Sequence, residues 1–391
     1  MRVGGIVAAK AKVMTIFGTR PEAIKMAPLV KELEQSEVLE SVVTVTAQHR
    51  EMLDQVMDLF KIVPDYDLNL MRPGQTLFTI TAGALTGLEG VLKNEKPDLV
   101  LVHGDTTTTF VAGLASFYLQ IPVGHVEAGL RTGNKLSPFP EEMNRRLTGV
   151  VADLHFAPTV NSGQNLLDEG ISPESIYTTG NTVIDALKTT VDKEYTFDDP
   201  VLKQVDFDNK KVILVTAHRR ENLGEPMARI FRGIRRVLEQ VPEAEVIFPV
   251  HKNPKVREVV EQELGDIQRV HQIEPLDYEP FVNLLQKSYL IMTDSGGIQE
   301  EAPSLGKPVL VLRDTTERPE AVNAGTVRLV GTDAEKVEQE ALKLLKDPSA
   351  YREMSNAVNP YGDGLASRRI VQAIEKKLGF RKDKPEEFRA D

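Results

Sequence analysis

The feature that most restricts the fold of this chain is a series of short apolar runs that alternate with stretches of helical periodicity. The series begins with a strand predicted at residues 12–17, includes a second strand at 41–47 and continues to about residue 190. Strands that alternate with helices of about 10–15 residues form parallel sheets with helices on both faces. We therefore expect a doubly wound α/β domain in this part of the chain.

The alternation stops once and then starts again. Residues 191–209 are polar, and we interpret them as a linker. A strand predicted at 211–216 and a helix at 225–240 open a second series. A chain of 391 residues is longer than one ordinary hydrophobic core supports. The pattern therefore predicts two doubly wound domains, at residues 1–190 and 210–364, joined by the linker.

Composition excludes several classes of protein. The net charge of −11 argues against a nucleic-acid-binding protein, which is usually basic. The chain has no cysteine, so it forms no disulfide and no cysteine–zinc site, which suits a reducing compartment. Its apolar runs are shorter than the roughly 20 residues of a membrane-spanning helix. We expect a protein that binds neither nucleic acid nor membranes.

A strand–turn–helix segment at residues 289–301 carries the clearest candidate binding loop. Ser295, Gly296 and Gly297 follow an apolar strand, and a helix is predicted from Ile298. Glycines at such a turn let the backbone approach a ligand, and the start of a helix attracts an anion. Glu301 lies one turn into the helix, where its carboxylate could bind neutral hydroxyl groups beside that anion.

Polar clusters also follow the other predicted strands. In parallel sheets, ligands bind at the carboxyl ends of the strands. Arg20, Lys25 and Arg318 are candidate anion-binding residues, and His218 is a candidate acid or phosphate partner. Three carboxylates lack the spacing of a metal site: Asp105, Glu127 and Glu141. This mixture predicts a diphosphate site with proton-transfer groups, as a nucleotide-sugar would require.

Missing motifs narrow the chemistry further. No Gly-x-Gly-x-x-Gly motif follows a strand, and no tyrosine has a lysine four positions later. The chain also lacks a P-loop and a His-Glu-x-x-His motif. We therefore expect neither an NAD-dependent mechanism nor a zinc hydrolase, and predict no cofactor and no metal.

Seven motifs in order along the chain resemble one family, the bacterial non-hydrolysing UDP-N-acetylglucosamine 2-epimerases. The resemblance extends over residues 12–378. Each motif alone is a weak signal, but all seven in this order are specific to the family. The matching segments are GTRPEAIK (18–25), HGDTTT (103–108), HVEAGLRT (125–132), PEEMNR (140–145), TAHRREN (216–222), TDSGGIQEE (293–301) and RDTTERPE (313–320).

The resemblance implies the glycosyltransferase-B architecture. In it, two Rossmann-like domains face each other across an active-site cleft, and a C-terminal helix, here at about 365–391, returns to the first domain. It also implies reversible conversion of UDP-N-acetylglucosamine to UDP-N-acetylmannosamine in the cytoplasm, for cell-surface polysaccharides. The implied route is anti elimination of UDP to 2-acetamidoglucal, followed by re-addition after reprotonation at C2.

Roles for individual residues also come from the resemblance. It implies that His218 neutralises the departing UDP and that Arg145 orients the acid–base groups at C2, which are Asp105, Glu127 and Glu141. The sequence does not determine which carboxylate removes the proton. The residues implied to bind the UDP moiety are Arg20, Lys25, Ser295, Gly296, Gly297 and Arg318 at the diphosphate, Glu301 at the ribose and Phe281 at the uracil.

The resemblance further implies a homodimer and a second, activating molecule of UDP-N-acetylglucosamine. Gln48 and His49 resemble part of that regulatory site. Some relatives have an arginine near position 74, where this chain has Arg72-Pro73-Gly74. Three alternatives remain open: a hydrolysing epimerase that releases N-acetylmannosamine and UDP, a glycosyltransferase of the same architecture, and a non-catalytic UDP-sugar sensor.

Overall fold

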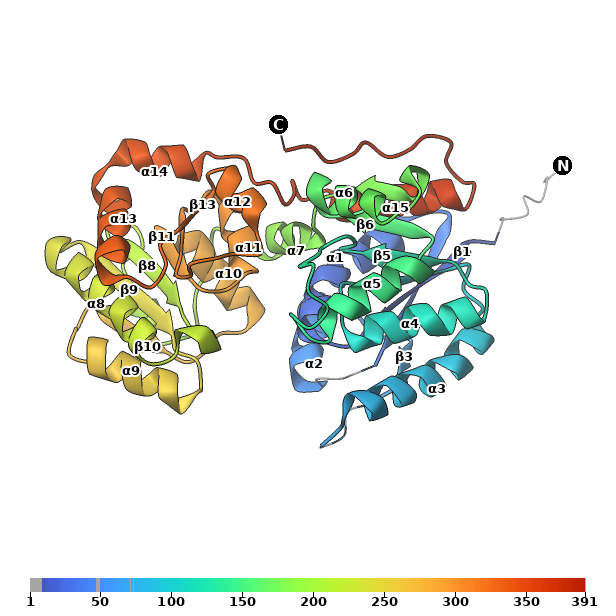
Figure 1. The fold of residues 1–391 in the computed structure, drawn as a ribbon, viewed down its shortest axis with the longest axis horizontal. Coiled ribbons are helices and arrows are strands. Elements are labelled where there is room, and N and C mark those ends of the chain that lie inside the picture. The colour runs from blue at the N-terminus through green and yellow to red at the C-terminus, as the bar shows by residue number, and fades with distance from the viewer. Residues whose placement is uncertain (1–8, 47–49, 71, 73, 391) are drawn as a thin grey trace. The chain divides into compact units, whose positions relative to one another are not determined.

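A computed structural model describes residues 9–46, 50–70, 72 and 74–390 (Figure 1). The chain forms two compact units. Unit 1 extends to Thr189 and also includes Gly362–Arg389, and unit 2 comprises Thr190–Tyr361. Each unit contains one wholly parallel sheet with helices on both faces, which confirms the predicted fold class. The predicted cleft between the two domains stays a prediction.

Unit 1 has a seven-stranded sheet in the order β3-β2-β1-β4-β5-β6-β7. Its strands are β1 (Ala11–Phe17), β2 (Leu39–Val45), β3 (Tyr66–Asp67), β4 (Leu99–His103), β5 (Val123–Val126), β6 (Leu154–Ala157) and β7 (Ile176–Thr178). Its helices are α1 (Arg20–Gln35), α2 (Arg50–Leu59), α3 (Leu77–Glu95), α4 (Thr107–Tyr118), α5 (Glu141–Val151), α6 (Val160–Asp168), α7 (Thr182–Thr190) and α15 (Ala366–Lys377), with a short 3-10 helix at Pro173–Ser175.

Two hydrophobic clusters cover the opposite faces of the unit 1 sheet. Alternating residues of β1 point to opposite sides, so Val13 lies in one cluster and Met14 in the other. The C-terminal helix α15 is part of this unit, because Ile370 and Ile374 are fully buried in the first cluster beside α1. Strands buried on both faces explain why the inner strands read as continuous apolar runs.

Unit 2 has a six-stranded sheet in the order β10-β9-β8-β11-β12-β13. Its strands are β8 (Lys211–Thr216), β9 (Ala244–Pro249), β10 (Val270–Ile273), β11 (Leu290–Thr293), β12 (Val309–Val311) and β13 (Val327–Leu329). Its helices are α8 (Glu225–Gln240), α9 (Pro254–Leu264), α10 (Tyr278–Lys287), α11 (Ile298–Ser304), α12 (Pro319–Asn323), α13 (Ala334–Lys346) and α14 (Pro348–Ser355), with 3-10 helices at Leu202–Gln204 and Arg220–Asn222.

The segment predicted as a linker, residues 191–209, lies within unit 2. Phe197 and Leu202 are buried in its core, and Phe197 contacts Tyr195 and Phe207 through their rings. The polar residues around these aromatic side chains dominate the composition of the segment, which is why it reads as a linker. Unit 2 therefore begins at Thr190, whereas the sequence pattern placed its start at residue 210.

Both sheets reverse their strand order at one point, between β1 and β4 in unit 1 and between β8 and β11 in unit 2. In open parallel sheets, such switch points leave a crevice at the carboxyl ends of the strands where ligands bind. Of the predicted site residues, Arg20, Asp105, His218 and Ser295 follow β1, β4, β8 and β11, in that order. None of the helices that the structure describes is both long and apolar enough to cross a membrane.

Candidate functional site

The turn after β5 holds Glu127 in an unusual backbone conformation. Its φ is +61°, in the left-handed region that residues other than glycine seldom adopt. Strained backbone of this kind is concentrated at functional sites, where the surrounding structure maintains it. Here the turn places the Glu127 side chain at the carboxyl edge of the sheet, where three polar residues surround its carboxylate.

Those three residues come from three different elements. Lys25 of α1 forms an ion pair with Oε2 of Glu127, and the Asn181 side chain donates a 2.9 Å hydrogen bond to the same oxygen. His103, at the end of β4, places Nε2 3.7 Å from it. Burial lowers the pKa of His103 to about 4, so this ring is neutral at physiological pH. The Glu127 carboxylate is thus held by a cation and an amide donor.

Asp105 has a different environment. It follows β4, and its carboxylate forms an ion pair with the guanidinium of Arg145 from α5. Burial raises the pKa of Asp105, and the positive charge of Arg145 opposes that rise. The backbone carbonyl of Asp105 accepts a 2.9 Å hydrogen bond from Asn144, which fixes the turn. Two carboxylates in unlike environments are a common arrangement for acid–base work.

The third predicted carboxylate, Glu141, begins α5 and is half-buried. Its neighbour Glu142 is fully buried and accepts hydrogen bonds from the N–H groups of Thr132 and Gly133. Glu142 also lies 3.4 Å from Arg145. Glu142 therefore has a structural role in holding the loop before α5, and Glu141 remains available at the helix start.

Arg20 and Glu22 lie at the start of α1, after the strand that borders the switch point. Thr19 caps this helix, and Glu22 completes the capping box. The buried Glu22 carboxylate also accepts hydrogen bonds from Thr106 (2.6 Å) and Thr109 (3.0 Å) of the loop after β4. Glu22 thus ties together the two loops that carry Arg20 and Asp105.

In unit 2, the loop after β11 brings Ser295, Gly296 and Gly297 to the start of α11. Neither glycine has a positive φ, so the turn itself does not require them. The constraint at 296 is spatial: an added Cβ would lie 3.1 Å from Oε1 of Glu317 and 3.4 Å from the guanidinium carbon of Arg318, so these side chains would have to shift slightly. The backbone at Gly296 therefore lies directly beside the guanidinium group of Arg318.

Arginines gather beside this loop. Glu317 contacts Arg219, Arg313 and Arg318 at 3.2, 2.7 and 3.6 Å. Although burial acts to raise it, the pKa of Glu317 is lowered to about 2 by hydrogen bonds and by these cations. Arg318 also donates a 2.8 Å hydrogen bond to Glu300. Three guanidinium groups thus surround the carboxylate of Glu317, and their N–H groups suit an anionic ligand.

The predicted nucleoside-binding residues lie on neighbouring helices of unit 2. Glu301 of α11 is buried, and Phe281 of α10 packs against the core. The Tyr278 side chain, also on α10, faces Glu301. Burial, together with this carboxylate, raises the pKa of Tyr278 well above its usual value.

His218 follows β8 and lies 3.5 Å from the buried carboxylate of Asp294, which follows β11. The structure therefore brings His218 to the same sheet edge as Ser295. Gln48 and His49, predicted to belong to a regulatory site, lie outside the described residues. Gly74 has a φ of +72° in the loop before α3.

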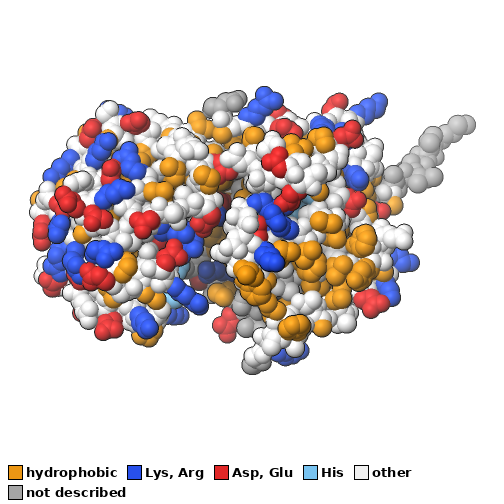
Figure 2. All heavy atoms as spheres, in the orientation of Figure 1, with side chains coloured by type: hydrophobic (Ala, Val, Ile, Leu, Met, Phe, Trp, Pro, Cys, Tyr) orange, Lys and Arg blue, Asp and Glu red, His pale blue; other side chains and the backbone are white. Residues whose placement is uncertain are grey.

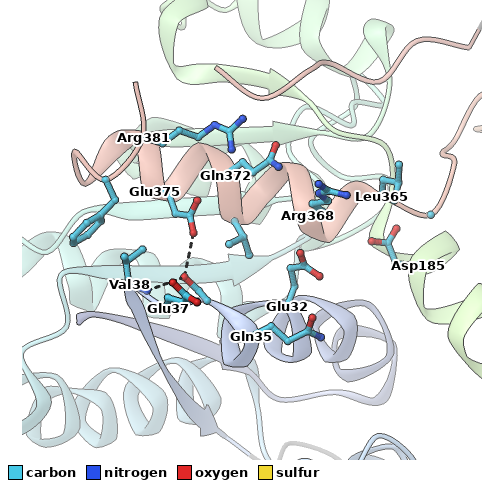
Figure 3. A pocket seen from close by; sticks show the side chains of 14 residues that line it. Glu32, Gln35, Glu37, Val38, Asp185, Leu365, Arg368, Gln372, Glu375 and Arg381 are labelled. Atoms are coloured by element: carbon cyan, nitrogen blue, oxygen red, sulfur yellow. Dashed lines mark hydrogen bonds between the residues drawn. The ribbon is translucent and has the colours of Figure 1, made fainter. Parts of the chain in front are cut away.

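A cavity of about 750 Å³ in unit 1 lies between α1 and α15 (Figure 3). It is lined by Gln35 to Val38, which lead into the amino end of β2, and by Arg368 and Glu375 of α15. The cavity is therefore at the edge of the sheet opposite to the carboxylates. None of the predicted site residues lines it. Across the described ranges, no group of three or more His, Cys, Asp or Glu side chains could hold a metal ion.

Sequence reasoning missed Asn181, Glu22 and Asp294. Glu22 could have been found, because Thr19-x-x-Glu22 is a capping-box pattern. Asn181 and Asp294 also follow strands, but only the structure identifies their partners.

Comparison with known proteins identifies relatives over nearly the whole chain. The family model described as UDP-N-acetylglucosamine 2-epimerase matches residues 31–375. A UDP-N-acetylglucosamine 2-epimerase of Bacillus subtilis strain 168 is 62% identical over 379 residues, which cover 97% of this chain and 99% of that protein.

Solved structures agree with that match. A putative UDP-N-acetylglucosamine 2-epimerase from Listeria monocytogenes has a TM-score of 0.92 at 56% identity and covers 97% of this chain and 100% of its own. The 2-epimerase from Neisseria meningitidis, solved bound to UDP-GlcNAc, has a TM-score of 0.83 at 54% identity and covers 93% and 100%.

Proposed function

Because the chain belongs to the UDP-N-acetylglucosamine 2-epimerase family, we propose that it interconverts UDP-N-acetylglucosamine and UDP-N-acetylmannosamine without hydrolysis. The observation that carries this proposal is the pair of carboxylates in unit 1. Glu127 is held by Lys25 and Asn181 in a left-handed turn, and Asp105 is held by Arg145. Inversion at C2 requires that one group remove a proton and another return it on the opposite face.

The proposed reaction begins with anti elimination. A carboxylate of unit 1 removes the C2 proton, the C1–O bond breaks, and its electron pair leaves with UDP to give 2-acetamidoglucal. UDP then adds again after C2 is protonated on the other face. We assign the proton transfers to Asp105, Glu127 and Glu141, with Arg145 orienting Asp105. Stabilising the departing diphosphate lowers the barrier to C1–O cleavage.

The proposed diphosphate-binding groups are the unit 2 loop and nearby cations. The close approach of Gly296 to Arg318 supports this assignment, as does the gathering of arginines around Glu317. We assign Arg20 of unit 1 to the same anion, with Lys25, the partner of Glu127, nearby. In this proposal Glu301 binds the ribose and Phe281 contacts the uracil.

The products distinguish this proposal from its alternatives. After incubation with UDP-N-acetylglucosamine alone, anion-exchange chromatography and ³¹P NMR should find UDP-N-acetylmannosamine and no accumulation of free UDP. Free UDP with N-acetylmannosamine would identify a hydrolysing enzyme. UDP binding with no product would indicate a transferase or a sensor. As a control, Asp105→Asn should retain UDP binding and lose epimerisation.

We also propose that UDP-N-acetylglucosamine activates the enzyme at a second site that includes Gln48 and His49. This proposal rests on the resemblance of that segment to the family's regulatory site. Initial rates should then depend sigmoidally on substrate, and His49→Ala should make the curve hyperbolic. A hyperbolic curve for the wild-type enzyme would contradict it.

The homodimer is proposed on the basis of one apolar face of unit 1. Figure 2 shows hydrophobic side chains gathered over α4 and α5, where Phe117, Tyr118, Leu147 and Val150 are exposed. Contiguous apolar surface of this kind marks protein–protein contacts. Val150→Asp should convert a dimer to a monomer in light scattering. Val63→Asp changes an exposed valine in the loop after α2 and should leave the dimer intact.

A further inference from the structure

The end of β11 places a buried carboxylate beside His218. Thr293 pairs with Thr216 in the sheet, so Asp294 follows β11 at the level where His218 follows β8. The backbone N–H of Asp294 donates a 3.1 Å hydrogen bond to the Thr216 carbonyl. Asp294 is fully buried, whereas the His218 side chain is 44% exposed. A ligand can therefore reach the imidazole of His218 but not the carboxylate behind it.

The two oxygens of Asp294 have different partners. Oδ2 accepts hydrogen bonds from the backbone N–H groups of His218 (2.9 Å) and Arg219 (2.8 Å) and from the side chain of Asn222 (3.2 Å). Oδ1 is buried and has no hydrogen-bond partner among the described residues. It lies 3.5 Å from Nδ1 of His218. A small rotation of the imidazole would bring an Nδ1–H group within hydrogen-bonding distance of Oδ1.

A second histidine restricts the plane of the ring. His251 stacks on His218 with ring centroids 5.4 Å apart and planes 6° apart. Nδ1 of His251 accepts a 3.1 Å hydrogen bond from the backbone N–H of Asn253, so its proton is on Nε2. Charged and titratable groups facing His218 in the described part of unit 2 are thus Asp294, His251 and Arg219. Burial lowers the pKa of His218. Asp294 opposes this shift, and the charges of His251 and Arg219 add to it.

We propose that Asp294 is a positioning residue that accepts Nδ1–H of His218 and thereby presents Nε2 to the departing diphosphate. This inference rests on the proposed function, in which His218 serves the leaving group. As the C1–O bond breaks, its electron pair stays on the phosphate oxygen. The imidazolium stabilises that oxygen through its Nε2–H group, either by donating a hydrogen bond or by transferring the proton. The proton returns to Nε2 on re-addition. Asp294 remains an acceptor throughout and compensates the charge of the imidazolium.

A purely structural role for Asp294 is the competing explanation, because Oδ2 alone holds the loop at residues 218–222. Asp294→Asn separates the two roles. The amide oxygen can take over the three donors of Oδ2, so the loop and UDP binding should persist. The amide nitrogen then faces Nδ1 of His218 and donates to it. Nδ1 becomes an acceptor, and the ring proton moves to Nε2.

The first test measures this tautomer and does not depend on activity. Long-range ¹H–¹⁵N NMR of histidine-labelled protein at pH 8 should show His218 with its proton on Nδ1 in the wild-type protein. In Asp294→Asn the proton should be on Nε2. The signals are assigned by their loss in His218→Asn. The same tautomer in the wild-type protein and in Asp294→Asn would overturn the proposal.

The second test follows the reaction. Because loss of the negative charge lowers the pKa of His218, the alkaline limb of the kcat profile should move to lower pH by about 1 unit in Asp294→Asn. The value of kcat should fall by about tenfold to a hundredfold, with a smaller change in KM.

Asn222→Ala is the matched control. It removes a donor to Oδ2 and to the Leu312 carbonyl but leaves Oδ1 facing His218. Its alkaline limb should stay at the wild-type pH. An equal shift in both variants, or none in Asp294→Asn, would contradict the proposal. If the wild-type protein forms no UDP-N-acetylmannosamine, the proposed function fails, and the tautomer measurement still decides whether Asp294 orients His218.

Discussion

The side-chain amide of Asn181 donates a 2.9 Å hydrogen bond to the Glu127 carboxylate, and its orientation is fixed from the other end. Oδ1 of Asn181 accepts the backbone N–H of Val183 at 3.1 Å, in the first turn of α7. The nitrogen must then face Glu127, where it can only donate. Together with Lys25, this donor favours the ionised form of Glu127, the form needed to accept a proton.

Asn181→Asp should therefore impair catalysis without unfolding α7. The new carboxylate still accepts the Val183 N–H, but it lies against Glu127. A like charge raises the pKa of Glu127, so the acidic limb of kcat/KM should move to higher pH by about 1 unit. Asn165→Asp removes an amide that donates to the Gly129 carbonyl and should leave the limb in place. An unchanged profile for Asn181→Asp would exclude Glu127 as the titrating base.

Arg145→Gln should likewise raise the pKa of a carboxyl group, that of Asp105. Burial raises the pKa of Asp105, and Arg145 provides the main opposing charge. Without that charge the pKa rises further, so less carboxylate is present at neutral pH and kcat should fall most at acidic pH. The next residue provides the control, because Arg146 pairs with Glu142 and Glu169 and not with Asp105. Equal pH profiles for Arg145→Gln and Arg146→Gln would contradict the assignment.

Glu22→Met should destabilise unit 1. The carboxylate accepts hydrogen bonds from Gly18, Thr19, Thr106 and Thr109, and an apolar side chain of similar length accepts from none of them. Leaving buried donors unsatisfied costs about 1–3 kcal/mol each. Urea unfolding measures the loss. Glu34→Gln, which removes an exposed pair with Lys31 on the same helix, should change the free energy of unfolding by less than about 1 kcal/mol.

Acid should destabilise unit 1 through its buried histidines. Burial lowers the pKa of His103 and His155 to about 4 and that of His125 to about 3. A folded pKa below the unfolded value means that the stability is present above pH 6.5 and is lost as the pH falls toward the folded value. At pH 5 each histidine should cost about 2 kcal/mol.

Hydrogen exchange of peptides from β4 and β5 between pH 7.5 and 5, corrected for the intrinsic pH dependence, measures this loss. In His125→Gln the side chain can still donate to the Gly104 carbonyl, which His125 contacts at 2.7 Å, but it does not titrate. Its stability should decline less steeply with acid. A slope equal to that of the wild-type protein would mean that His125 does not protonate in the unfolding transition.

The sequence predicted the positions of helices and strands accurately where apolar residues recur at regular spacing. The helix predicted at 225–240 coincides with α8, whose apolar side chains recur at helical spacing. The strand predicted at 41–47 is found at Leu39–Val45, because Leu39 and Glu40 before the apolar run also pair with β1. The part of unit 2 that precedes β8 was not recognised, because the polar residues around Phe197 and Leu202 made that segment resemble a linker.

Site residues were predictable where they follow strands, since the topology of a parallel sheet brings strand ends to one edge. Their partners were not. Asn181 is 54 residues from Glu127, and Asp294 is 76 residues from His218. Pairings over such distances depend on the order of strands in the sheet and on side-chain orientation. No local pattern in the sequence encodes either.

Proton exchange at C2 is the central claim, and NMR in D₂O tests it most directly. Purified protein is incubated with UDP-N-acetylglucosamine and no added cofactor, and the ¹H spectrum is followed. The account predicts signals of UDP-N-acetylmannosamine with deuterium at C2, and no such product from Glu127→Gln or Asp105→Asn. A product that keeps its C2 proton, or release of free N-acetylmannosamine with UDP, would contradict it.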